Sequence, residues 1–73
     1  MKYLGKNDQG DYEVVDLEVE HPAGPTIINT IFNEKIIQVT ANPGEVIVRL
    51  ASGGWPIIFT EEAFQASFQK IED

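Results

Sequence analysis

Apolar and polar residues alternate along much of this chain, and turn-forming residues interrupt the alternation at short intervals. The pattern is clearest between Glu13 and Glu20, where Val15, Leu17 and Val19 share one parity and carboxylates dominate the other. Successive side chains of a strand point to opposite faces, so we expect a strand with one buried and one solvated face. Weaker alternation predicts further strands at Lys2–Leu4, Ile36–Ala41, Val46–Leu50 and Trp55–Phe59.

The stretch Thr26–Phe32 differs because both of its parities are partly apolar, with Ile27 and Ile31 on one and Ile28 and Phe32 on the other. Its isoleucine and threonine content favours a strand. Such a strand is either covered on both faces or holds one face for a partner, and a homo-oligomer is one way to bury it.

Turn signals separate these strands. Asn42–Glu45 suits a type II turn, because glycine supplies the positive φ at the third position, and we expect it to join Ile36–Ala41 and Val46–Leu50 as a hairpin. Pro56 cannot donate a hydrogen bond to a sheet, so its strand is expected to be short or at an edge. Other turns or loops are expected at residues 7–10, 21–25, 33–35 and 52–54.

Thr60 is a good helix N-cap, and the two glutamates after it favour a helix start. Phe64, Phe68 and Ile71 recur at helical spacing and predict one apolar stripe. A helix that ends near Ser67, with residues 68–71 as a closing strand, is the alternative. The chain is therefore expected to be a single domain over residues 1–73, mainly β (α+β): an antiparallel meander or small, partly open barrel of about five strands with one short C-terminal helix.

Charge narrows the choice of partners. The chain of 73 residues has 12 acidic and 5 basic side chains, a net charge of −7, and no cysteine. This excess of acid disfavours direct binding to nucleic acid or anionic lipid, and no apolar run approaches the ~20 residues of a membrane helix. The absence of cysteine excludes disulfides and thiolate metal sites, and favours a reducing cytoplasm. A charged partner is expected to present a basic surface.

The carboxylates of the regular strand form a row with a spacing of about 6.8 Å, from a rise of about 3.4 Å per residue. Such a row could occupy a basic groove built for nucleic acid, or it could simply keep a small protein soluble. Tryptophan and tyrosine are enriched at interface hot spots, although a lone tryptophan is also a common core element. The residues expected to bind a partner are Asp11, Tyr12, Glu13, Asp16, Glu18, Glu20 and Trp55.

Nothing in the sequence points to catalysis. His21 is the only histidine, and no nucleophile motif accompanies it. Asn7–Asp11 lacks the ligand spacing of a calcium loop, and no phosphate-binding glycine loop is present. We expect no catalytic residue, no metal site and no cofactor. A deep pocket around His21 would revive an enzyme hypothesis.

Three motifs follow one another in the C-terminal half: Pro43-Gly44-Glu45-Val46, Gly54-Trp55-Pro56-Ile57, and Phe64-x-x-x-Phe68-x-x-Ile71. Over residues 36–71 this succession resembles small phage and prophage accessory proteins, which carry Pro-Gly-Asp-aromatic, Gly-x-aromatic-Pro and Phe-x-x-x-Tyr motifs. This chain has glutamate for the aspartate, valine for the first aromatic residue, and a longer stretch before the last motif. The resemblance implies no catalytic residues and a location in the cytoplasm of a bacterial host cell.

Two functional hypotheses result. The first is a non-enzymatic acidic protein of phage or prophage type that inhibits or modulates a host protein, such as one that handles nucleic acid or serves defence. The second is a small structural or self-assembling homo-oligomeric β-protein.

Overall fold

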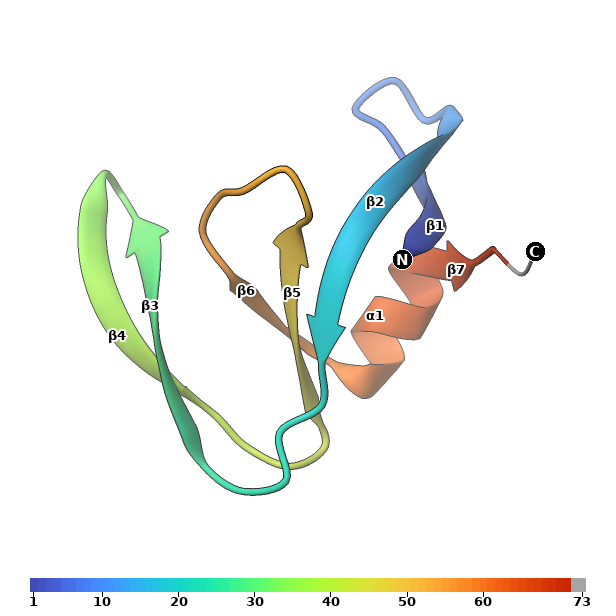
Figure 1. Ribbon diagram of the computed structural model, residues 1–73. Coiled ribbons are helices and arrows are strands. Elements are labelled where there is room, and N and C mark those ends of the chain that lie inside the picture. The colour runs from blue at the N-terminus through green and yellow to red at the C-terminus, as the bar shows by residue number, and fades with distance from the viewer. Residues whose placement is uncertain (72–73) are drawn as a thin grey trace.

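The chain forms a curled antiparallel sheet, a separate hairpin and one short helix, as a computed structural model that describes residues 1–71 shows (Figure 1). The elements in chain order are β1 (Lys2–Lys6), β2 (Tyr12–Glu20), β3 (Thr26–Phe32), β4 (Lys35–Ala41), β5 (Glu45–Leu50), β6 (Ile57–Thr60), α1 (Glu61–Ser67) and β7 (Phe68–Lys70). The five-stranded sheet has the order β6-β5-β2-β1-β7, and β3 pairs with β4. The mainly β prediction is confirmed, with the sheet as a half-barrel.

Strand pairing departs from a meander at the hairpin. The Asn42–Glu45 turn forms as expected, with Gly44 at φ 93° and the Glu45 N–H donating to the Asn42 carbonyl at 3.0 Å. The expected hairpin between the flanking strands is wrong, however, because β4 pairs with β3. The physical reason is that both edges of β5 are already occupied, one by β2 and the other by β6.

Phe64 is the centre of the core. Thr60 caps the helix by accepting a hydrogen bond from the Ala63 N–H at 3.1 Å, and α1 then directs Phe64 onto the core face of the sheet. The Phe64 ring lies 5.4 Å from Tyr3, 6.2 Å from Phe59 and 5.4 Å from Phe68, measured between centroids. Around this cluster lie three more buried aliphatic side chains: Leu17, Val46 and Val48.

An aromatic contact draws the two edges of the sheet toward each other. Phe59 belongs to β6 and Phe68 to β7, the strands at opposite edges, yet their ring centroids are only 6.0 Å apart. The sheet must curl to permit this contact. The seven-residue α1 links the two edge strands and supplies Phe64, whose ring lies against both of theirs.

The helix ends earlier than the apolar stripe. Phe68 has extended backbone angles, φ −135° and ψ 141°, and begins β7, which pairs with β1. A helical stripe through Phe68 and Ile71 is therefore wrong, and the closing-strand alternative is correct for residues 68–70. Pairing with β1 satisfies the backbone while the Phe68 side chain still reaches the core. The choice between helix and strand also concerned residue 72, which lies outside the described residues.

The β3–β4 hairpin leaves the sheet and projects to one side of it (Figure 1). Asn33 and Glu34 form its turn with φ of 49° and 64°, the two positive values of a type I′ hairpin turn. One of its faces, the inner hairpin face, turns toward the back of the sheet, where the Thr30 hydroxyl donates to the Pro56 carbonyl at 2.6 Å. The other, the outer hairpin face, carries Ile27, Asn29, Ile31, Ile36, Gln38 and Thr40.

The central position of Phe64 predicts that F64A lowers the free energy of unfolding by about 3–5 kcal/mol, or unfolds this small domain. The matched control F32A removes an equally large ring that is 64% exposed, and should change stability by only about 0.5 kcal/mol. Urea unfolding followed by far-UV circular dichroism measures both. Equal losses for the two variants would contradict a core centred on Phe64.

Gly5 should not tolerate a side chain, because a Cβ there would lie 2.9 Å from two carbons of the Phe68 ring. Gly5→Ala is therefore expected to destabilise the fold by about 1–3 kcal/mol. A Cβ at Gly24 would meet no atom within 4 Å, so Gly24→Ala should leave stability unchanged or raise it by up to about 1 kcal/mol. Thermal unfolding of the pair checks this order, and the reverse order would refute it.

Candidate protein-binding site

The acidic strand has the two faces that its pattern predicts. On the core face of β2, Leu17 is only 3% exposed, and Val15 and Val19 pack beside the core. On the back face, away from α1, Asp16, Glu18 and Glu20 are all exposed. The carboxylate row therefore exists as expected.

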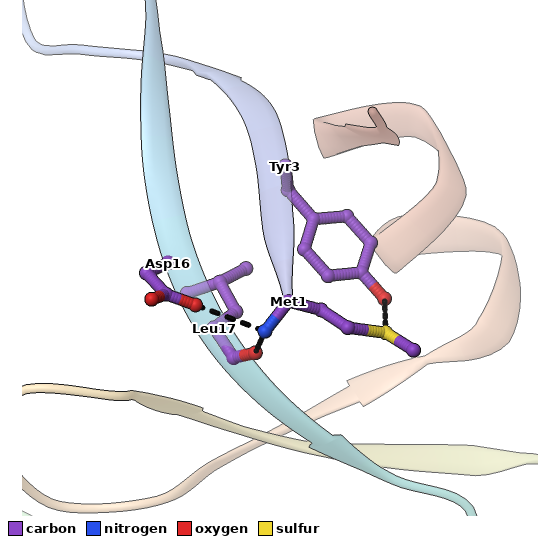
Figure 2. A network of polar contacts seen from close by, with 4 residues as sticks. All are labelled: Met1, Tyr3, Asp16 and Leu17. Carbon is purple, nitrogen blue, oxygen red and sulfur yellow. Dashed lines mark hydrogen bonds and ion pairs between the residues drawn. The ribbon is translucent and has the colours of Figure 1, made fainter. Parts of the chain in front are cut away.

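Positively charged groups of the same chain lie beside part of this carboxylate row. The Met1 amino group donates to the Asp16 carboxylate at 2.9 Å and to the Leu17 carbonyl at 3.1 Å (Figure 2). Lys2 lies directly opposite Asp16 in the register of β1 and β2. The charge at Asp16 is thereby largely balanced within the chain.

Glu18 has a partner of its own, because Arg49 lies opposite it in the register of β2 and β5. The Arg49 guanidinium donates a hydrogen bond to the Glu18 carboxylate. This hydrogen bond and the charge of Glu18 raise the pKa of Arg49 above its ordinary value. Among residues 1–71, Glu20 forms no ion pair, so it is the member of the row most available to an outside cation.

Two hollows, one on each face of the sheet, include Arg49 in their lining, and together we call them the Arg49 site. The first, about 250 Å³, is acidic at one side and is lined by Glu18, Glu20, Ile28, Ile47, Arg49 and Pro56. The second, about 190 Å³, is mainly apolar, and its lining includes Leu17, Leu50, Trp55, Ile57, Phe59 and again Arg49. Three of the predicted partner-binding residues line this site: Glu18 and Glu20 line the back-face hollow, and Trp55 lines the core-face hollow.

Trp55 belongs to a surface hollow rather than to the buried core. Gly53 and Gly54, with φ of 114° and 122°, lead into it in a conformation that side chains rarely adopt. Its ring is 42% exposed and borders the apolar hollow. A half-exposed indole beside an apolar hollow is a common form of interface anchor.

The remaining predicted residues lie at the other end of β2. Tyr12 is 64% exposed and receives the Lys6 ammonium 5.5 Å from its ring centroid. The Asp11 N–H donates to the Asn7 side chain within a turn. Glu13 is seven residues from Glu20, about 23 Å along the strand, so Asp11, Tyr12 and Glu13 do not join the Arg49 site.

Three residues of this site were not predicted from the sequence: Arg49, Leu50 and Ile57. In the sequence, Arg49 is the one charged residue within the apolar stretch Val46–Leu50. Its importance depends on the pairing of β5 with β2, which places it against Glu18. A cation in a strand opposite an alternating acidic strand is a usable signal, but only once that pairing is known.

His21 occupies an open position. Its Nε2 is 3.7 Å from a Glu61 carboxylate oxygen, and the two side chains are 64% and 43% exposed. Within residues 1–71, no three histidine, aspartate or glutamate side chains gather closely enough to hold a metal ion. No helix in this part of the chain has the length and apolar character needed to span a membrane.

Comparisons with known protein families, with curated proteins and with solved structures gave no significant match to this chain.

Proposed function

We propose that this chain is a non-enzymatic protein-binding module that grips a partner at the Arg49 site. The partner would place a large apolar side chain in the hollow beside Trp55, on the core face, and a lysine or arginine against Glu20, on the back face. Inhibition or modulation of a host protein is the function that such a grip would serve.

The observation that carries this proposal is that Arg49 lines both an apolar hollow on the core face of the sheet and an acidic hollow on its back face. A hollow of about 190 Å³ has the size to accept one large apolar side chain. Its rim includes Leu50 and Ile57, which are 50% and 56% exposed and would lose contact with water on binding. Anchors of this kind supply much of the affinity of protein interfaces.

Charge favours a basic partner. The chain carries a net charge of −7, and such a field accelerates the approach of a positive surface. At close range, Glu20 lines the acidic hollow and forms no ion pair within residues 1–71, whereas Glu18 is shared with Arg49. The long-range field and the short-range contact therefore select the same kind of partner.

A phage or prophage setting in a bacterial cytoplasm belongs to the same proposal. Its support is the resemblance of residues 36–71 to small phage and prophage proteins, whose Gly-x-aromatic-Pro motif corresponds here to Gly53-Gly54-Trp55-Pro56. Gly53, Gly54 and Trp55 of that motif line the apolar hollow.

A displayed library of random peptides, selected on the immobilised protein, tests this function without knowledge of the natural partner. We expect enrichment of peptides that combine a large apolar residue with a nearby lysine or arginine. W55A should weaken a selected peptide about 30-fold, as loss of an interface anchor does. E20Q should weaken it about 3- to 10-fold and reduce its dependence on salt.

E62Q is the matched control, since it removes one exposed carboxylate on α1 and should leave peptide affinity unchanged. Failure of the library to enrich any sequence above a blank surface would contradict the proposal. So would selected peptides that bind W55A and E20Q as tightly as the unmodified protein.

A further inference from the structure

The outer hairpin face is an apolar surface that the fold leaves uncovered. Ile27, Ile31 and Ile36 lie on it and are 69%, 45% and 64% exposed. Ile31 and Ile36 are directly opposite each other in the register, so their side chains form one continuous patch. The Arg49 site is on the other side of the hairpin, where only inner-face residues such as Ile28 line it.

The hairpin has little support from the rest of the chain. It forms its own two-stranded sheet, and a two-stranded sheet is only marginally stable in water unless something packs against it. On its inner side, the Thr30 hydroxyl bond to Pro56 links it to the body, and an open apolar hollow of about 370 Å³ remains between Ile37, Val39 and Ile58. A partner on the outer face would supply the missing packing.

Charge distribution indicates which partner fits. Residues 26–41 contain Glu34 and Lys35 as their only charged residues, so the hairpin is neutral while the rest of the chain carries the entire −7. Two copies that met through any acidic part of the body would repel each other. Two copies that met through the hairpins would join neutral surfaces and keep the acidic bodies apart, because the hairpin projects from the body (Figure 1).

The area is sufficient for a weak dimer. Ile27, Ile31 and Ile36 and their polar neighbours Asn29, Gln38 and Thr40 are all exposed, so a second copy can cover the whole face. Six residues from each copy make an interface below about 1,200 Å² in total, the range of weak and transient contacts.

We infer that a second copy of this chain covers the outer hairpin face, in a dimer related by a two-fold axis. Such an interface uses the same patch on both copies, so Ile27, Ile31 and Ile36 of each copy pack against those of the other. This dimer leaves the Arg49 site of each copy open.

Sedimentation equilibrium of the unmodified chain tests the dimer directly. We expect the apparent mass to rise from 8.1 kDa toward twice that value between about 1 μM and 1 mM, with Kd on the order of 10–100 μM. I27K and I36K should each weaken the dimer at least tenfold, because each would bury a lysine ammonium in the interface.

V14K is the matched control, since Val14 is a strand valine that is 59% exposed outside the hairpin. All three variants change the net charge by the same single unit, so a general charge effect would appear in V14K as well. Far-UV circular dichroism should show that all three remain folded, because each replaced side chain is already exposed.

A strict monomer at 1 mM would overturn the inference, as would a dimer that resists both I27K and I36K or one that V14K weakens equally. Peptides selected at the Arg49 site should bind the monomeric I27K variant as tightly as the unmodified protein. The dimer can therefore fail while the proposed function stands, and the reverse also holds.

Discussion

Packing of aromatic rings around Phe64 is the interaction on which the rest of the structure depends. The ring reaches the sheet from a helix of only seven residues and contacts Tyr3, Phe59 and Phe68, which come from three different strands. Two of these strands, β6 and β7, form opposite edges of the sheet. A core as small as that of a 73-residue chain can hold an open sheet in a curved shape only by concentrating its largest side chains at one point.

This arrangement determines what remains exposed. Helix α1 covers part of the core face, so the end of the half-barrel near Trp55 stays open as an apolar hollow beside Arg49. The back face holds charged residues of both signs on neighbouring strands, with Arg49 against Glu18. The hairpin shares none of the Phe64 cluster, and its outer isoleucines face water. The molecule thus offers two separate surfaces: the Arg49 site, which has charged residues at its rim, and the outer hairpin face, which has none.

Local patterns in the sequence predicted the local features of the structure. The alternation of apolar and polar residues predicted the two faces of β2. The Asn42–Glu45 turn and the Thr60 helix cap were also predicted, because their hydrogen bonds join residues that are near neighbours in the chain. The non-local features were missed. The spacing of Phe64 and Phe68 fits a continuous helix equally well, and only pairing with β1 makes Phe68 the start of a strand.

The same distinction applies to the site. Trp55, Glu18 and Glu20 could be nominated as surface residues of the right chemistry from sequence alone. Their positions in the Arg49 site depend on the pairing of β5 with β2, which excludes the β4–β5 hairpin that the Asn42–Glu45 turn suggested. Strand pairing also places cations beside the acidic row, because Lys2 and Arg49 lie opposite carboxylates only in the observed registers.

The central claim is that the Phe64-centred half-barrel is the stable unit and that the β3–β4 hairpin is a weaker unit attached to it. Native-state amide hydrogen exchange, read residue by residue at low protein concentration, tests this claim most directly. We predict that amides of β2 and β5 exchange only through global unfolding, whereas paired amides of β3 and β4 exchange at least tenfold faster through local opening. Hairpin amides protected as strongly as those of β2 and β5 in the dilute protein would contradict it.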